Sequence, residues 1–309
     1  MTDIVISEFM DEAAIREHLG EFEVLYDPKL VEQPQRLYAM LSDCRALVVR
    51  NRTQVRGALL EAAPGLRVVG RLGVGLDNID VSACTTRGIR VYPATGANDL
   101  AVAEYVICAA LLLLRRAWFA TAEVAAGKWP RMELIGRELA GKRLGLIGFG
   151  AIARLTARKA LALGMTVAAY DPFVEPRDEA WHGIERQELA PLLAASEIVS
   201  LHIPLTPQTR HLINGAAIAL MRPGSILINA ARGGVVDEAA LIEALRTRRL
   251  GGAALDVFES EPLTAASGAA WLDLPNLLLT PHIAGVTEES NVRVSQVVAR
   301  AVREALGDR

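Results

Sequence analysis

The chain contains few cysteines and few aromatic residues. Only three of its 309 residues are cysteines, Cys44, Cys84 and Cys108, and 5% are aromatic. Three widely separated cysteines form neither a disulfide framework nor a C-x-x-C motif, which predicts a reducing compartment such as the cytoplasm. The scarcity of bulky aromatic side chains argues against a pocket for a large hydrophobic substrate.

The chain also lacks an excess of charge of one sign and a long apolar run. Its 33 Lys and Arg residues nearly balance 36 Asp and Glu residues, which argues against nucleic-acid binding and against an acidic disordered chain. The most apolar run, Tyr105 to Leu114, is much shorter than the ~20 residues that span a bilayer. The N-terminus has no signal-peptide pattern, and no His/Cys cluster has the spacing of metal ligands. We therefore expect no nucleic-acid, membrane or metal partner.

Short runs of β-branched residues alternate with helical patterns, which predicts an α/β protein with parallel sheets. A chain of 309 residues is long enough for about two domains. An unbroken helical pattern from Asp99 to Arg116 separates two series of strands, and a final helix is expected from Glu288 to Leu306. The expected strands are Ile4–Ile6, Glu23–Tyr26, Leu47–Val49, Leu66–Val69 and Ile89–Val91, then Arg143–Ile147, Thr166–Tyr170, Ile198–Leu201, Ser225–Ile228, Ala253–Leu255 and Leu277–Leu279.

A glycine-rich loop follows one expected strand directly and opens a helical run. Its sequence, Gly148-Phe149-Gly150-Ala151-Ile152-Ala153, has the pattern G-x-G-x-x-A. In a dinucleotide fingerprint the first glycine permits a tight turn, the second lets a pyrophosphate approach the backbone, and the small last residue allows close helix–strand packing. The helix that begins at Ala151 and Ile152 adds unpaired N–H groups and the positive end of its dipole.

The next expected strand leads into Asp171. In this fingerprint the acid that binds the ribose follows the first glycine by ~20 residues, and Asp171 has a similar spacing from Gly148. A carboxylate there accepts hydrogen bonds from ribose hydroxyls and repels a 2′-phosphate, which predicts NAD as the cofactor. The alternative is a turn-forming glycine pair and a surface aspartate that bind nothing.

Polar residues follow all six strands of the second series. Because ligands bind beyond the carboxyl ends of parallel strands, this pattern predicts one site at one edge of a sheet. The residues are Gly148, Asp171, His202 to Pro204, Asn229 to Gly234, Asp256 with Glu261, and Thr280 to His282.

Six stretches of the chain resemble the D-isomer-specific 2-hydroxyacid dehydrogenases. The resemblance extends from about Leu47 to the C-terminus and implies NAD(H)-dependent interconversion of a 2-hydroxy acid and its 2-keto acid. The stretches are Gly73–Asp80 (GVGLDNID), the loop at Gly148, Leu201–Asn214 (LHIPLTPQTRHLIN), Ile228–Asp237 (INAARGGVVD), Ala254–Pro262 (ALDVFESEP) and Leu279–Gly285 (LTPHIAG).

The resemblance also implies two doubly wound parallel-sheet domains with the active site in a cleft. A Rossmann NAD-binding domain would span residues 99–284, and a flavodoxin-like substrate domain would combine residues 1–98 and 285–309. Family members pair through the region from Leu100 to Trp129, which includes Trp118, so we expect a C2 homodimer. Because the chain ends at residue 309, we expect no C-terminal regulatory domain.

The chemistry implied by the resemblance agrees with the residue types present. Hydride transfer to a ketone builds negative charge on the carbonyl oxygen, which requires a proton donor, and a fixed cation should hold the substrate carboxylate. His282 is the expected acid/base, because an unperturbed histidine titrates near ~6.5, and Arg232 is the expected carboxylate clamp. Glu261 matches the family acid that pairs with this histidine and favours its imidazolium form. The other histidines are expected on a surface helix (His18), in polar loops (His182, His211) and at the adenine end of the cofactor (His202).

The remaining contacts are assigned from the family positions and from the glycine loop at residues 73–75, whose N–H groups can form an anion-binding nest. Arg50 is added because it ends a strand expected to face the cleft, and Asn51 and Arg52 follow it. Asp256 is expected at the nicotinamide end. The expected cofactor contacts are Gly148, Gly150, Ala151, Ile152, Asp171, His202, Pro204, Ala230, Arg232, Asp256, His282 and Gly285. The expected substrate contacts are Arg50, Asn51, Arg52, Val74, Gly75, Asn98, Arg232 and His282.

Arg50 and Arg52 suggest the class of substrate. In an extended strand these two residues share a face, and with Asn51 they could hold a second anion, although a turn after Arg50 would break this arrangement. A guanidinium suits phosphate, sulfonate and carboxylate. We therefore expect a three-carbon acid of the 3-phosphoglycerate or 3-sulfolactate type, ahead of lactate-like or glycerate-like acids.

Two other readings stay open. A dinucleotide-responsive interaction protein, like the corepressors built on this fold, could retain most of these residues. The other is a glycerate/hydroxypyruvate-type reductase. For Arg52 itself, the alternative to a substrate contact is a solvated surface residue.

Overall fold

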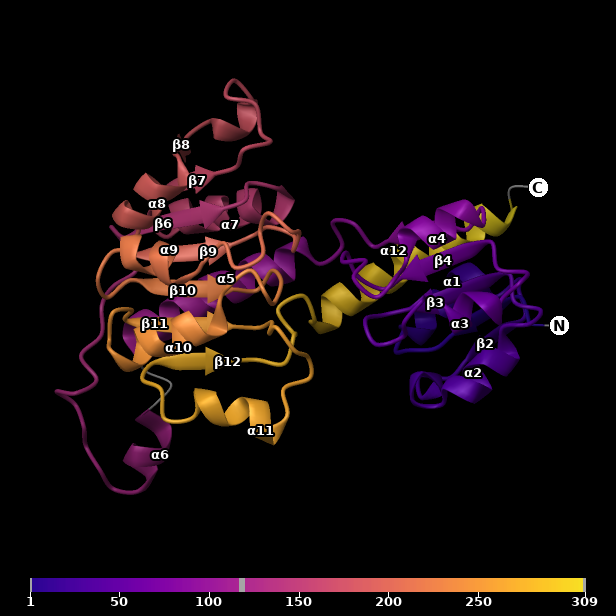
Figure 1. Ribbon diagram of the computed structural model, residues 1–309, viewed down its shortest axis with the longest axis horizontal. Helices are drawn as coiled ribbons and strands as arrows, with labels where there is room; N and C mark the ends of the chain where they lie inside the picture. The colour runs from indigo at the N-terminus through magenta and orange to yellow at the C-terminus, as the bar shows by residue number, and fades with distance from the viewer. Residues whose placement is uncertain (1, 117–119, 308–309) are drawn as a thin grey trace. The chain divides into compact units, whose positions relative to one another are not determined.

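The computed structural model describes residues 2–116 and 120–307. The chain divides into two compact units, Met1–Asn98 with Gly285–Arg309, and Asp99–Ala284. Each unit has one sheet in which all paired strands are parallel, so the predicted α/β class is confirmed (Figure 1). None of the described helices is long and apolar enough to cross a membrane.

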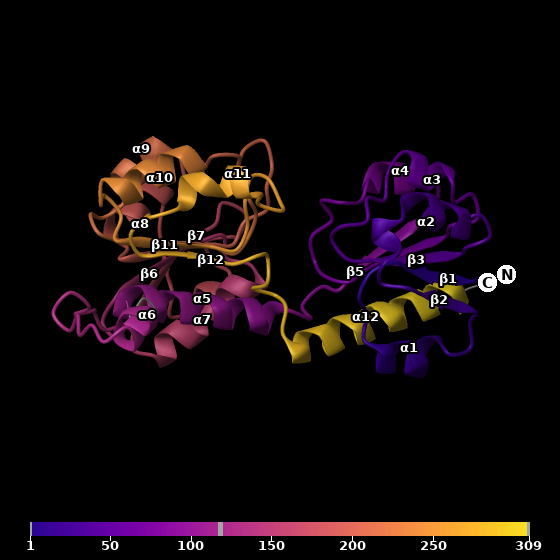
Figure 2. The ribbon, with the colours of Figure 1, turned by 90° about the horizontal axis from the view of Figure 1, so that it is seen from below.

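The first unit has a five-stranded sheet in the order β2-β1-β3-β4-β5, the flavodoxin-like order. Helices α1 and α12 cover one face, and α2, α3 and α4 cover the other (Figure 2). Asp11 caps α1 by accepting the Ala14 N–H at 2.9 Å. The elements are β1 Ile4–Ile6, α1 Glu12–Leu19, β2 Val24–Tyr26, η1 Leu30–Glu32, α2 Pro34–Met40, β3 Ala46–Val49, α3 Ala58–Glu61, β4 Val68–Arg71, α4 Val81–Thr86, β5 Arg90–Pro93 and α12 Glu288–Gly307.

The second unit has a seven-stranded sheet in the order β12-β11-β10-β9-β6-β7-β8. This is the Rossmann order with one more strand, and the order reverses between β6 and β9, which is where such sheets bind ligands. Helices α5 and α7 lie on one face, and α8, α9 and α10 lie on the other (Figure 2). The elements are α5 Asp99–Arg115, α6 Ala120–Ala125, β6 Arg143–Ile147, α7 Ala151–Ala162, β7 Thr166–Tyr170, η3 Glu179–Trp181, β8 Glu185–Arg186, α8 Leu189–Ala195, β9 Ile198–Leu201, α9 Gly215–Leu220, β10 Ile226–Asn229, α10 Glu238–Arg246, β11 Gly252–Leu255, α11 Ala265–Gly268, η4 Ala269–Trp271 and β12 Leu277–Leu279.

The strands lie close to where the β-branched runs predicted them, with small shifts at their ends. The strand expected from Leu66 begins at Val68, because Leu66 first closes a turn onto the Ala63 carbonyl. The short strand β8 is exposed at the edge of its sheet and has no run of buried residues that would predict it. Most strand residues are buried on both faces, which explains the near-continuous aliphatic runs.

Candidate active site

The glycine-rich loop joins β6 to α7 at the point where the strand order reverses. Gly148 has φ +87°, and a Cβ there would lie 2.5 Å from the His202 carbonyl oxygen, so only glycine fits this crossing. Gly150 begins α7 without a side-chain cap, and no atom occupies the space that its Cβ would fill. The first turn of α7 therefore presents backbone N–H groups to open space, as a pyrophosphate requires.

Asp171 lies at the end of β7, beside this loop. Its carboxylate accepts the N–H of Phe149 at 2.7 Å and the N–H of Phe173 at 2.8 Å. Each carboxylate oxygen has further lone-pair sites, so both can also accept ribose hydroxyls. The loop and this acid together fit a dinucleotide such as NAD.

His202 follows β9 and faces the glycine loop through its backbone carbonyl. Its Nε2 lies 3.0 Å from the Ser200 hydroxyl, and burial lowers the pKa of His202 to about 4. The ring is therefore neutral at pH 7 and is a poor proton donor there.

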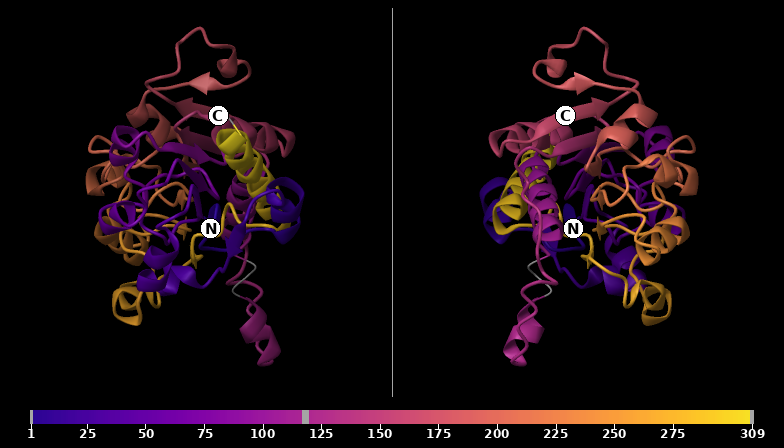
Figure 3. Two further views of the ribbon diagram at one scale, coloured as in Figure 1. Left: turned by 90° about the vertical axis from the view of Figure 1, so that its right-hand side faces the viewer. Right: turned by 90° about the vertical axis from the view of Figure 1, so that its left-hand side faces the viewer.

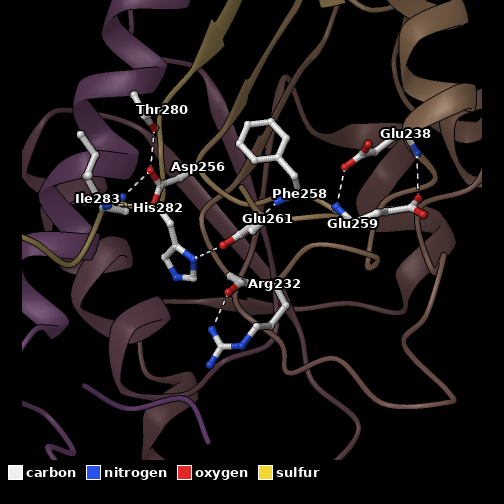
Figure 4. A network of polar contacts seen from close by, with 11 residues as sticks. Arg232, Glu238, Asp256, Phe258, Glu259, Glu261, Thr280, His282 and Ile283 are labelled. Carbon is white, nitrogen blue, oxygen red and sulfur yellow. Dashed lines mark hydrogen bonds and ion pairs between the residues drawn. The ribbon is translucent and has the colours of Figure 1, made fainter. Parts of the chain in front are cut away.

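His282 and Glu261 form a direct pair at the ends of β12 and β11 (Figure 4). His282 Nδ1 lies 2.7 Å from Glu261 Oε2, and Glu261 Oε1 accepts the Phe258 N–H at 3.0 Å. Burial opposes ionisation of Glu261, but bonds from His282 and Phe258 and the positive charges of His282 and Arg232 hold the Glu261 pKa below its ordinary value. Glu261 is thus an ionised partner for the imidazole.

The backbone of His282 is held in an unusual conformation. Its φ is +57°, a region that residues other than glycine rarely adopt, and its N–H donates to the Asp256 carbonyl at 2.8 Å. The Asp256 carboxylate accepts bonds from the Thr280 hydroxyl and from the N–H groups of Ile283 and Ala284, at 2.6 to 2.8 Å. Burial raises the pKa of Asp256, although these bonds offset part of the effect.

Asp256 therefore shapes the segment that carries His282, a role that the sequence analysis did not foresee. Thr280 was expected among the polar residues at the strand ends but without a role, and Tyr105 was not expected in the site. The Tyr105 hydroxyl lies 2.6 Å from that of Thr280, and burial raises the pKa of Tyr105 to about 12. The position of Thr280 directly after a strand was a signal, but Tyr105 lies within an apolar helix and gave none.

Arg232 lies on a tight loop after β10. The Asn229 side chain accepts the Ala231 N–H at 3.1 Å and donates to the Arg232 carbonyl at 2.9 Å. A Cβ on Gly233 would lie 1.7 Å from the Phe258 carbonyl oxygen, so this loop packs directly on the segment that carries Glu261. The Arg232 guanidinium donates to the Ala231 carbonyl at 2.6 Å (Figure 4).

The three expected substrate contacts at residues 50–52 lie in the first unit, on a loop after β3. Buried Glu8 accepts the N–H groups of Arg50, Arg52 and Thr53 at 2.9 to 3.2 Å. The Arg50 guanidinium donates to Asn291 Oδ1 at 2.7 Å, whereas Arg52 pairs with Glu32 at 3.2 Å.

This geometry corrects the premise that Arg50 and Arg52 share a strand face. β3 ends at Val49, so residues 50–52 do not alternate, and the two guanidinium groups have different partners. Asn51 is exposed on the same loop.

The other expected residues are distributed over both units. In the first unit, Val74 and Gly75 lie after β4, and a Cβ on Gly285 would lie 2.4 Å from Asn98 Nδ2. In the second unit, Pro204 is exposed after β9 and Ala230 is half-buried after β10. Among the described residues, no group of His, Cys, Asp or Glu could hold a metal ion.

The burial of His18 corrects a further expectation. It was expected on a surface helix, but it is only 8% exposed, and its Nε2 accepts a bond from Arg300 of α12 at 3.4 Å. The docking of α12 on α1 therefore covers a side chain that the helical pattern alone left at the surface.

The chain is similar to known proteins over most or all of its length. The family model for the D-isomer specific 2-hydroxyacid dehydrogenase, NAD binding domain, matches residues 107–284. The (S)-sulfolactate dehydrogenase of Chromohalobacter salexigens is 55% identical over 310 residues, which cover all of both chains. The D-3-phosphoglycerate dehydrogenase of Methanocaldococcus jannaschii is 39% identical over 99% of this chain but only 58% of its own length.

The chain is also similar to solved structures. The D-lactate dehydrogenase of Aquifex aeolicus, complexed with NAD and lactic acid, has a TM-score of 0.85 and 29% identity, and the match covers 98% of this chain and 95% of that one. The sequence relatives are named as dehydrogenases of 2-hydroxy acids. The chain therefore belongs to the D-isomer-specific 2-hydroxyacid dehydrogenase family and is an NAD-dependent oxidoreductase.

Proposed function

We propose that this dehydrogenase acts on a 2-hydroxy acid with a second anionic group, of the 3-sulfolactate type. The observation that carries the proposal is the full-length 55% identity to a protein named (S)-sulfolactate dehydrogenase. The half-buried Arg50, which is held by Asn291, supports it with a cation suited to a sulfonate or phosphate.

The reaction uses Arg232, His282 and Glu261. When bound, NAD(H) supplies or accepts the hydride. In ketone reduction Arg232 holds the substrate carboxylate through parallel guanidinium donors, and Nε2 of the His282 imidazolium delivers a proton to the carbonyl oxygen as its carbon is reduced. Ionised Glu261, at 2.7 Å from Nδ1, stabilises the imidazolium. In the reverse direction neutral His282 takes the hydroxyl proton.

The first unit is assigned to the substrate. Backbone N–H groups around Val74 and Gly75 supply a further anion-binding element, and Arg50 binds the distal anion. Because Arg52 pairs with Glu32 at an exposed position, it contributes less than Arg50.

A substrate panel tests this assignment. We expect kcat/KM for 3-sulfolactate or 3-phosphoglycerate to exceed that for lactate and glycerate. Arg50→Ala should lower the preference for the anions by about 10-fold or more, since a charged hydrogen bond contributes ~1.5–3 kcal/mol, whereas Arg52→Ala should keep most of it. Best turnover of glycerate or lactate would exclude the distal anion. Absence of turnover with all four acids would show that the substrate lies outside this panel.

A cytoplasmic C2 homodimer is the assembly that we propose. Helix α6 and the segment after it project from the body of the second unit (Figure 3), where Trp129, Met132 and Ile135 are 79%, 71% and 64% exposed. Such exposed apolar side chains favour burial against a second copy. Trp118, also expected in this interface, lies outside the described residues. A monomeric mass by light scattering at micromolar concentration would exclude the dimer.

A further inference from the structure

A second histidine–carboxylate cluster lies beside the His282–Glu261 pair. Glu238 begins α10, and Glu259 lies two residues before Glu261. The Glu259 N–H donates to Glu238 Oε1 at 2.7 Å, and the Glu238 N–H donates to Glu259 Oε1 at 3.4 Å (Figure 4). These reciprocal bonds tie the start of α10 to the segment that carries Glu261.

His211 joins the same cluster from a third loop. Its Nε2 lies 3.0 Å from Glu259 Oε1, and its backbone N–H donates to the Gly234 carbonyl at 2.7 Å. Gly234 lies two residues after Arg232, so His211 connects the Arg232 loop to the Glu261 segment.

The contacts leave little freedom between these segments. Gly233 lies directly against the Phe258 carbonyl, and Phe258 in turn donates its N–H to Glu261. A shift of residues 258–259 would therefore displace Glu261 and alter its contact with His282.

The cluster also concentrates charge. Glu238 faces Glu259, Glu261 and His211; burial raises the Glu238 pKa, the two carboxylates raise it further, and His211 lowers it. Carboxylates placed close together repel one another, and the reciprocal backbone bonds and the His211 contact oppose this repulsion.

We infer that Glu238, Glu259 and His211 are positioning residues that set the distance between Arg232 and the His282–Glu261 pair. The inference rests on the proposed roles of those three residues. The described side-chain bond of His282 is to Glu261, so these positioning residues act on it through the backbone of residues 258–261.

The test compares Glu238→Ala with Glu238→Gln. We expect Glu238→Ala to lower kcat by about 10- to 100-fold, the effect of a small misplacement, with little change in the KM for NAD. In the pH profile of kcat for ketone reduction, the decline at high pH should begin at a lower pH. The reason is that a displaced Glu261 stabilises the His282 imidazolium less well. Glu238→Gln should restore most of kcat, since its amide oxygen still accepts the Glu259 N–H.

Glu243→Ala is the matched control. Glu243 lies on the same helix, and its side chain forms an exposed pair with Arg246, so this variant should keep the wild-type kcat and pH profile. If Glu238→Ala is unstable, His211→Gln provides the same readouts. The inference would be overturned if Glu238→Ala and His211→Gln both kept the wild-type kcat and pH profile. It would also be overturned if Glu238→Gln were as impaired as Glu238→Ala.

The variants His282→Ala and Glu261→Gln distinguish a failure of the positioning inference from a failure of the proposed mechanism. If His282→Ala and Glu261→Gln lose turnover but Glu238→Ala does not, the positioning inference alone is wrong. If His282→Ala keeps turnover, the proposed acid/base is wrong.

Discussion

Individual residues in this protein have roles that depend on their immediate partners. His282 and His202 both follow strands of the same sheet. His282 pairs with an ionised carboxylate at 2.7 Å, whereas burial beside Ser200 lowers the pKa of His202 to about 4. Of these two histidines, only His282 combines partial exposure with a carboxylate partner, as a proton donor at an active site requires.

Replacement of His282 by Ala should therefore remove the proton donor. We expect kcat to fall by about 10²–10⁴-fold, the usual contribution of acid–base catalysis, with little change in the NADH dissociation constant measured by fluorescence titration. Near-wild-type turnover in this variant would show that another group transfers the proton.

Asp171 should determine the choice of cofactor. A 2′-phosphate would place a second anion beside this carboxylate, which already accepts two backbone N–H groups. We expect kcat/KM with NAD to exceed that with NADP at least ~100-fold. This ratio corresponds to a difference of about 2.7 kcal/mol in activation free energy, at 1.36 kcal/mol per decade. Asp171→Ala should reduce this preference, and comparable kcat/KM values in the wild type would contradict the assignment.

At the level of elements, long-range side-chain bonds hold the loop after β3. Glu8 accepts three N–H groups of residues 50–53, and Asn78 Nδ2 donates to the carbonyls of Arg50 and Thr53 at 3.3 and 2.7 Å. The loop conformation that places Arg50 thus depends on residues from two other segments.

Glu8→Gln should destabilise the folded loop at residues 50–53. The substitution replaces one accepting carboxylate oxygen by an NH₂ group, which cannot accept the backbone N–H that this oxygen bonds. We expect a loss of about 1–3 kcal/mol in the free energy of unfolding, the typical effect of an unsatisfied buried group, as measured by urea titration. The control Glu32→Gln removes only an exposed ion pair with Arg52 and should change stability by less than ~1 kcal/mol. Equal effects of the two substitutions would contradict the role of Glu8.

At the level of the whole molecule, burial of His202 links stability to pH. Its pKa is lowered from 6.5 to about 4 on folding, so between these values the unfolded chain binds a proton that the folded chain does not. The contribution is favourable above pH 6.5 and is lost as the pH falls toward 4.

His202→Gln should therefore flatten the decline in stability between pH 6.5 and 4. The expected difference from the wild type is up to about 3 kcal/mol at 1.36 kcal/mol per pKa unit, as measured by thermal or denaturant unfolding across this range. His182→Gln, at an exposed position, serves as the control. Parallel pH profiles for wild type and His202→Gln would contradict the prediction.

Local sequence patterns predicted the elements and the cofactor loop of this protein. The aliphatic runs predicted the strands because both faces of a parallel sheet are buried. The G-x-G-x-x-A loop and Asp171 were identifiable because their chemistry depends on backbone geometry and spacing within one βαβ unit.

Only the tertiary structure determined the partners of the side chains at the loops. The separate partners of Arg50 and Arg52, the burial of His18, the bonds of Asp256 and the Glu238–Glu259 cluster all join residues from different segments. No periodicity in the sequence encodes such contacts, because they arise only when strands, helices and their connecting loops pack together within each unit.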